Sequence, residues 1–348
     1  MFKFYSGRIE LTPNQNGMEE IFMKAIVYTK YGPPEVLQLK EVEKPTPKDN
    51  EVLVKVCAAS LNAADLEILR GVFVNRIAVP IKTMYKILGT DLAGQIREVG
   101  RNVKQFQPGD EIWGDLSFPL CSSTFAEYVC VPENALRLKP ASMTFEEAAA
   151  IPTAGVVALQ NLLAKRPIQP GQKVLINGAG GGVGTFAVQL AKYFGAEVTG
   201  VDSTEKLEML SSIGAYHVID YTQEDFTKSG KRYDLILDVV VHRWIFDYKR
   251  VLNPEGVAVM VGGSMSQVFL NILLGTLMTG RKKVGIGMWK PNKKEDLDLL
   301  KELFEAGKVK PVIDKVYHLS EVPEAFRYLE EGHAQGKLVI TMEHNNKE

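Results

Sequence analysis

A glycine-rich stretch followed by an acidic residue is the feature of this sequence that points most clearly to chemistry. The stretch VLINGAGGGVG, residues 174–184, closes an apolar run and opens an amphipathic segment, and Asp202 follows roughly 20 residues later. Glycines at a strand-to-helix turn let the backbone approach a pyrophosphate, whose charge the amide groups and the helix N-terminus then hold. A flexible connecting loop is the alternative. The pattern favours a dinucleotide site formed by Gly178, Gly181, Gly182, Val183 and Gly184.

The stretch GVDSTEK, residues 200–206, carries opposite signals for the nucleotide. Asp202 is suited to accept hydrogen bonds from a free ribose 2′-hydroxyl, which favours NAD(H). Ser203 and Lys206 are suited to a 2′-phosphate, which favours NADP(H). Asp202 would repel that phosphate by about 1 kcal/mol in water-like surroundings, unless it turns away and pairs with Lys206.

Two kinds of pattern surround these stretches. Residues 23–150 hold short β-rich runs separated by Pro, Gly and Asn, which indicates an irregular β domain. Residues 151–287 alternate strands with amphipathic helices, which predicts a doubly wound parallel sheet and an α/β fold. We count five strands there, at 173–177, 197–202, 217–220, 233–240 and 257–263.

The fifth of these strands supplies further candidates. Ligands of open α/β sheets bind beyond the carboxyl ends of the strands. Cofactor contacts are therefore expected at the end of VMVGGSM, from Gly262, Gly263 and Ser264.

Composition excludes several classes of function. The 348 residues carry 41 basic and 42 acidic side chains without a basic block, which argues against nucleic-acid binding. No apolar run is long enough to span a bilayer, and residues 1–22 form a polar extension unlike a secretory signal. Cys57, Cys121 and Cys130 suggest neither a disulfide framework nor a metal lobe. We therefore expect a reducing, cytoplasmic location and no membrane contact.

Longer motifs resemble the medium-chain dehydrogenase/reductase superfamily, and within it the zinc-free quinone oxidoreductase (zeta-crystallin-like) branch. They are GTDLAG, PGDEIWG, FAEYV, EEAAAIPTAGVVAL, the glycine block, GAYHVIDY and GKLVI. The resemblance implies a GroES-like substrate domain from residues 23–150 and 288–348, a Rossmann domain at 151–287, and a homodimer. It favours NADP(H), with Lys206 and Tyr221 holding the 2′-phosphate, although Asp202 stands where the family usually has a small or neutral residue.

The same resemblance argues against a metal. Zinc alcohol dehydrogenases carry a zinc-binding Cys where this chain has Asn62, and His-Glu where it has Thr90 and Asp91. Asn and Thr are poor substitutes for thiolate and imidazole, so no zinc site is expected. Without zinc to stabilise an alkoxide, hydride transfer from NAD(P)H to a quinone or an α,β-unsaturated carbonyl fits better than alcohol oxidation.

The resemblance also implies residues near the reacting atoms. Asn62 resembles an Asn near the nicotinamide and is a candidate catalytic and cofactor residue. Thr153 lies in the stretch that reaches the nicotinamide carboxamide, with a helix N-cap as the alternative. Phe73 stands where many quinone oxidoreductases have a Tyr near the pocket, which removes one possible donor. Tyr85 is a candidate donor in the substrate pocket, with a core or surface tyrosine as the alternative.

Two other functions remain open at this point. A nucleotide-binding regulatory or structural protein without turnover would keep the same glycine loop. A zinc-type alcohol dehydrogenase is the third reading, and Asn62 and Thr90 oppose it.

Overall fold

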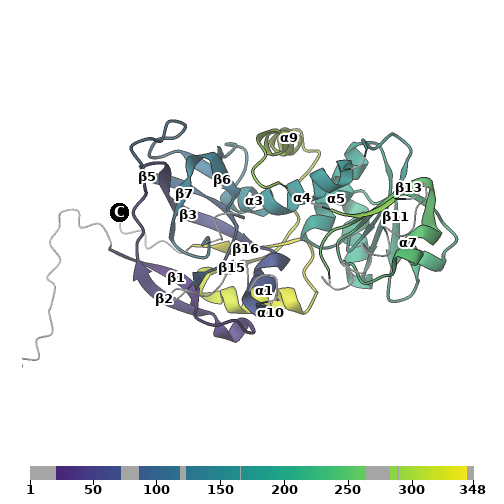
Figure 1. Cartoon of the computed structure of the whole chain (residues 1–348), viewed down its shortest axis with the longest axis horizontal. Helices are drawn as coiled ribbons and strands as arrows, with labels where there is room; N and C mark the ends of the chain where they lie inside the picture. The colour runs from purple at the N-terminus through teal and green to yellow at the C-terminus, as the bar shows by residue number, and fades with distance from the viewer. Residues whose placement is uncertain are drawn as a thin grey trace, which may run out of the picture.

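The computed structural model describes residues 21–71, 86–117, 123–164, 166–263, 283–287 and 290–342. Tyr85, Ser264, Phe73 and Cys121, which were singled out above, lie outside these ranges, as do residues 1–20 of the expected extension. Within them the chain forms two parts, a β-rich part and an alternating α/β part, with helices α4 (Pro152–Leu163) and α9 (Lys294–Glu305) between (Figure 1). No described helix is both long and apolar enough to cross a membrane.

The β-rich part contains two sheets. A three-stranded sheet has the order β2-β1-β4, and a seven-stranded sheet has the path β15-β16-β3-β5-β6-β8, with β7 paired to β3. Their strands are β1 (Phe22–Tyr28), β2 (Gln38–Glu43), β3 (Glu51–Leu61), β4 (Lys86–Ile87), β5 (Asp91–Val99), β6 (Glu111–Asp115), β7 (Tyr128–Pro132), β8 (Leu136–Leu138), β15 (Ile313–His318) and β16 (Lys337–Thr341).

The last strands of the chain belong to this part. Strand β16 pairs antiparallel with β3, so that Leu338 lies opposite Leu61, and β15 continues the sheet beyond it. Helix α10 (Val322–Glu330), drawn in yellow in Figure 1, buries Phe326 edge-on against the Phe125 ring. This core therefore combines residues from both ends of the chain, whereas the exact domain boundaries given above stay a prediction.

The α/β part is built on a six-stranded parallel sheet with the order β11-β10-β9-β12-β13-β14. Parallel strands covered on both faces read as continuous apolar runs, as β9 and β12 do. The strands are β9 (Lys173–Asn177), β10 (Glu197–Asp202), β11 (His217–Asp220), β12 (Tyr233–Asp238), β13 (Leu252–Met260) and β14 (Lys283–Ile286). Five of these strands were predicted from the sequence. β14 was missed because its residues, KVGI, include a lysine and a glycine and form no continuous apolar run.

Helices cover both faces of this sheet. On one face, α4, α5 (Gly182–Tyr193) and α6 (Leu207–Ile213) share a core with β9 and β13 through residues such as Phe186 and Leu210. On the other, Tyr248 and Val251 of α7 (Ile245–Val251) pack against Leu175 and Ile236. The expected doubly wound α/β architecture beside a β-rich domain is confirmed.

Three shorter helical elements complete the arrangement that positions the site. Helix α1 (Ala63–Arg70) follows β3 directly and begins after Asn62. Helix α3 (Phe145–Ala150) begins with a capping box, in which Thr144 accepts from the Glu147 amide and Glu147 from the Thr144 amide. A 3₁₀ turn at Thr204–Lys206 leads from β10 into α6.

Candidate active site

A cleft of about 640 Å³ lies at the carboxyl ends of β9, β10 and β12, where the strand order reverses. This is the position at which open α/β sheets bind nucleotides. Its opposite wall comes from the β-rich part: the start of α1 and the segment 329–338. The lining residues that matter below are Asn62, Ala154, Gly178, Gly181, Gly182, Val183, Asp202, Lys206, Tyr221, His242, Arg243 and Lys337.

The glycine loop turns between β9 and α5 as its pattern predicts. Gly178 has φ of 78° and donates its amide hydrogen to the Val201 carbonyl at 3.0 Å, a backbone conformation that favours glycine. Gly181 is the N-cap of α5, and a methyl group there would meet only the Gly178 carbonyl, at 3.6 Å. The open space at this N-terminus fits a pyrophosphate group.

Gly184 differs from the other predicted loop residues because it does not line the cleft. A side chain at this position would collide with the Gly178 carbonyl oxygen and with Ala179. Gly184 therefore permits close packing of α5 on the loop that follows β9. Gly178, Gly181, Gly182 and Val183 lie on the cleft surface.

Asp202 turns toward the protein. Its carboxylate accepts the amide hydrogens of Gly180 at 2.7 Å and Ser203 at 2.9 Å, and lies 3.6 Å from the Lys206 ammonium. Of the two alternatives left open by the sequence, the structure has the ion pair between Asp202 and Lys206. The Asp202 carboxylate thus stabilises the glycine loop through its hydrogen bond with the Gly180 amide.

The other two residues predicted at the 2′-phosphate differ in exposure. Lys206 is 5% exposed, and its ammonium donates to the Gly332 carbonyl at 2.8 Å. Tyr221 lines the same end of the cleft and is 57% exposed. The Ser203 hydroxyl lies 3.4 Å from Glu205. Their part in phosphate binding stays a prediction.

A buried polar cluster forms the opposite end of the cleft. The Asn62 amide group donates to Thr90 Oγ1 at 3.1 Å and to Asp91 Oδ2 at 2.9 Å, and its oxygen accepts from the Lys337 ammonium at 2.6 Å. Both protons of the amide are therefore used within the protein. Asn62 remains at the cleft surface as an acceptor rather than as the donor that a developing oxyanion needs.

Thr153 joins this cluster instead of the cleft surface. It is the second residue of α4, with Ile151 at the N-cap, so the N-cap reading was wrong. Its amide and hydroxyl both donate to Asp91 Oδ1, at 2.9 and 2.7 Å, while its neighbour Ala154 lines the cleft. The predicted contact with a nicotinamide is not tested by this geometry.

Gly262 and Gly263 follow the end of β13, with φ of 79° and 84°. A side chain on Gly263 would collide with the backbone of Val241, in the segment after β12. The two glycines therefore let the loops after β12 and β13 pack closely. Neither lines the cleft, and their contact with the cofactor stays a prediction.

Sequence reasoning did not single out Lys337, Arg243 or His242, all of which line the cleft. Arg243 lies over the Phe226 ring, 4.7 Å from its centroid, and pairs with Asp225 at 3.0 Å. The lysine that begins the apolar run KLVI was the one available signal, because a charged residue at the start of a buried strand needs a partner.

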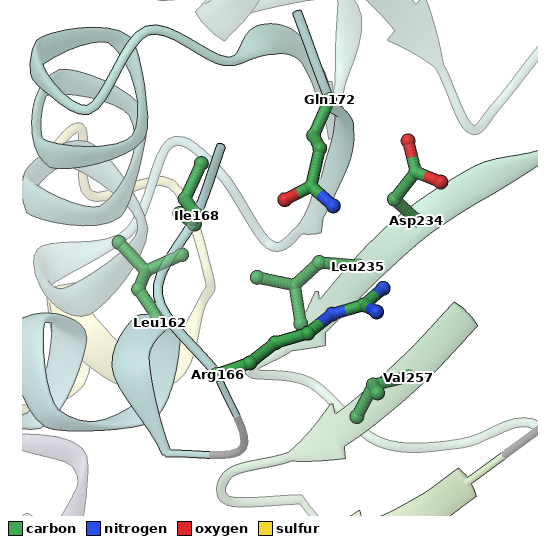
Figure 2. Close-up of a pocket in the computed structure, with 7 residues that line it drawn as sticks. All are labelled: Leu162, Arg166, Ile168, Gln172, Asp234, Leu235 and Val257. Atoms are coloured by element: carbon green, nitrogen blue, oxygen red, sulfur yellow. The ribbon is translucent and has the colours of Figure 1, made fainter. Parts of the chain in front are cut away.

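The small hollow in Figure 2 is at the other end of the sheet. It holds about 10 Å³ between Leu162, Leu235 and Val257, beside Gln172 and Asp234 at the beginnings of β9 and β12. That is room for about one water molecule, so it does not compete with the cleft as a substrate site.

Two further carboxylates are buried near the cluster. Burial raises the pKa of Asp65 to about 7, and the charge of Asp91 adds to the increase. Burial raises the pKa of Asp115, which lies opposite Asp91 on β6, to about 6. Asp65 Oδ2 accepts the backbone amide hydrogen of Asn62 at 2.9 Å, which caps α1 and gives this residue a structural role.

Asp65 should make stability depend on pH. Since its pKa is raised on folding, the folded protein keeps a proton that the unfolded chain has lost between about pH 4 and pH 7, so this contribution to stability falls as the pH rises through that window. Between pH 5 and pH 8, the free energy of unfolding of the wild type should fall by about 3 kcal/mol more than that of Asp65→Asn. Urea denaturation at both pH values measures the difference. An identical pH dependence in the two proteins would mean that Asp65 is ionised throughout.

Comparison with known proteins gives the family. Residues 48–141 match the alcohol dehydrogenase GroES-like domain, and residues 213–340 match a domain described as zinc-binding dehydrogenase. The mitochondrial NAD(P)H oxidoreductase RTN4IP1 of Mus musculus is 35% identical, over 92% of this chain and 89% of the relative. The chloroplastic NADPH-dependent alkenal/one oxidoreductase of Arabidopsis thaliana is 34% identical, over 91% and 79%.

A solved structure agrees over the whole fold. The quinone oxidoreductase from Coxiella burnetii superposes with a TM-score of 0.86 at 32% identity, covering 92% of this chain and 100% of that one. The two-part fold and the cleft define a dehydrogenase/reductase. The chain belongs to the medium-chain dehydrogenase/reductase superfamily, in its zinc-free quinone oxidoreductase-like branch, as the sequence motifs predicted.

Zinc does not fit this site, although one matching domain is named for it. At the positions that carry zinc ligands in the alcohol dehydrogenases, Asn62 donates hydrogen bonds to Thr90 and Asp91. The Lys337 ammonium donates to Asn62 and Asp91. A zinc site needs ligands such as thiolate or imidazole, whereas this cluster holds a buried cation and has neither among its described neighbours. Within the described residues no group of three His, Cys, Asp or Glu side chains is placed to hold a metal.

The expectation of a cytoplasmic location was wrong. It rested on cysteine usage, which reports the redox state of a compartment rather than the compartment itself. The RTN4IP1 relatives from mouse, zebrafish, human and cattle are named mitochondrial, which contradicts the cytoplasmic expectation.

Proposed function

We propose that this protein is a zinc-independent, NADPH-dependent reductase that transfers hydride to a quinone or to the β-carbon of an α,β-unsaturated carbonyl. One observation carries the proposal: a single cleft has a dinucleotide loop on one wall and, on the other, a polar cluster built around an ammonium instead of a metal. The named activities of the alkenal/one and quinone oxidoreductase relatives bear out the predicted enzyme class and its NADP(H) cofactor.

The chain's own residues bind and orient. When bound, NADPH supplies the hydride. The N-terminus of α5, with Gly181 and Gly182, holds the pyrophosphate, and Lys206 and Tyr221 lie at the end assigned to the 2′-phosphate. With the nucleotide bound in this direction, its nicotinamide would lie beside Asn62 and Ala154. The apolar side chains of Leu61 and Leu338 line the cleft there and limit the access of water.

The test is NADPH oxidation with a panel of quinones and enones, next to binding of NADPH by titration calorimetry. Turnover with either substrate class supports the proposal. Tight nucleotide binding without turnover on any member of the panel would favour the non-catalytic alternative instead.

We also propose a homodimer. The outer edge of β14 carries no strand partner within the described chain, and Ile286 on it is 39% exposed. Such an edge invites pairing with a second copy. Light scattering should then give twice the chain mass of 38.6 kDa.

A further inference from the structure

Lys337 is a buried lysine with defined partners. Its side chain is 2% exposed at the start of β16, and its ammonium donates to the Leu61 carbonyl at 3.1 Å, Asn62 Oδ1 at 2.6 Å and Asp91 Oδ2 at 3.4 Å. An ammonium has three N–H donors, and each has an acceptor here. Lys337 is therefore held as a fixed internal cation and is not a solvated surface residue.

Asp91 connects this cation to several elements. It is fully buried and accepts hydrogen bonds from Ser60 on β3, Asn62 before α1 and Thr153 on α4, besides Lys337 on β16. A buried carboxylate is stable as an ion only where charges and donors compensate its lost hydration. The pair thus links the β-rich part to α4, at the wall of the cleft.

The pair also fixes the orientation of the Asn62 amide. With its oxygen toward the ammonium and its nitrogen toward the carboxylate, both contacts are favourable. Rotating the amide by 180° would place its N–H groups against the ammonium and its oxygen against the carboxylate. Both of these contacts are repulsive. One lone pair of the Asn62 oxygen remains for a donor within the cleft.

Lys337 reaches the nucleotide loop as well. A methyl group on Gly182 would lie 3.0 Å from the Lys337 Cδ atom, and Gly336 donates its amide hydrogen to the Gly180 carbonyl at 2.8 Å. The aliphatic part of Lys337 therefore packs over the first turn of α5 while its ammonium holds Asn62. One side chain spans both walls of the cleft.

We propose that Lys337 is a positioning residue of this reductase, which together with Asp91 holds the Asn62 amide in one orientation relative to the dinucleotide loop. The proposal rests on the function proposed above. The fixed Asn62 oxygen then accepts from a hydroxyl or amide group of the bound cofactor or substrate, and Lys337 itself transfers no proton. A misplacement of about 1 Å at such a position can lower turnover by about 100-fold.

Lys337→Met is the first test, with Lys139→Met as the matched control. Lys139 is also a buried, ion-paired lysine, 3.0 Å from Glu111, but it lies outside the cleft. Lys337→Met should lower kcat by about 10- to 100-fold and change the NADPH Kd by less than about threefold. Lys139→Met should lose stability and keep both constants.

A double variant separates positioning from simple charge pairing. Lys337→Met leaves Asp91 without its cation, which destabilises the protein, whereas Asp91→Asn with Lys337→Met removes both charges. If Lys337 positions Asn62, the double variant regains thermal stability while kcat stays low. Recovery of kcat together with stability would show that the pair is only structural, and would overturn the proposal.

A readout that does not depend on turnover completes the test. In protein with ¹⁵N-labelled asparagine, the Asn62 side-chain amide hydrogens should exchange slowly with solvent in the wild type and in Lys139→Met, and quickly in Lys337→Met. Equal exchange in all three would contradict the positioning role. If the wild type reduces no quinone or enone, the reductase function fails, and this exchange measurement still decides whether Lys337 holds Asn62.

Discussion

Gly181→Ala should abolish most NADPH binding while leaving the protein folded and as stable as the wild type. The added methyl group meets only the Gly178 carbonyl oxygen, at 3.6 Å, which is an ordinary van der Waals distance, and the backbone has φ of −83°. It would, however, fill the space at the N-terminus of α5 through which a pyrophosphate approaches the amides. We expect an NADPH Kd at least about 30-fold higher, equal to about 2 kcal/mol.

Gly184→Ala is the matched variant, because it should fail in the opposite way. Its methyl group would collide with the Gly178 carbonyl and Ala179, so α5 must shift from β9 before any ligand is present. Overpacking of this kind costs about 1–3 kcal/mol of stability. Thermal unfolding and calorimetry on both variants distinguish the roles. Equal Tm losses, or unchanged NADPH affinity in Gly181→Ala, would contradict the assignment of Gly181 to the pyrophosphate.

The glycine loop was predictable because its information is local. Gly178, Gly181 and Asp202 lie within one strand-helix-strand unit, so their spacing alone places them at one cleft. The same holds for the parallel sheet, whose strands are continuous apolar runs between amphipathic helices. β14 was not predicted because its residues, KVGI, include a lysine and a glycine and therefore form no continuous apolar run.

The polar cluster was only half predictable. Asn62, Thr153 and the pair Thr90-Asp91 stood out by resemblance, but Lys337 lies 275 residues from Asn62 and meets it only because β16 pairs with β3. No local period encodes that contact. The orientation of the Asp202 carboxylate could not be predicted from the sequence either. Its partners include the Gly180 amide, whose direction is set by the folded loop rather than by residue types.

The hydrogen bonds of Asp202 should affect nucleotide affinity more than its charge affects the preference between NADPH and NADH. Because the carboxylate accepts from Gly180 and pairs with Lys206, Asp202→Ala should weaken NADH binding by about tenfold through a loosened loop. It should weaken NADPH binding by only about twofold, because the same substitution also removes the repulsion from the 2′-phosphate. Asp202→Asn keeps an acceptor for Gly180 and removes the negative charge. It should shift preference toward NADPH by about fivefold, equivalent to about 1 kcal/mol of repulsion removed from the 2′-phosphate.

Lys206→Met tests the other half of this pair. A methionine keeps the buried aliphatic packing and removes the cation, so NADPH affinity should fall by about tenfold while NADH affinity changes by less than about threefold. Titration calorimetry with both nucleotides on all three variants measures these ratios. If the wild type instead prefers NADH, and Asp202→Ala changes that preference to NADPH, Asp202 binds the free ribose 2′-hydroxyl. The ion pair between Asp202 and Lys206 would then open when the nucleotide binds.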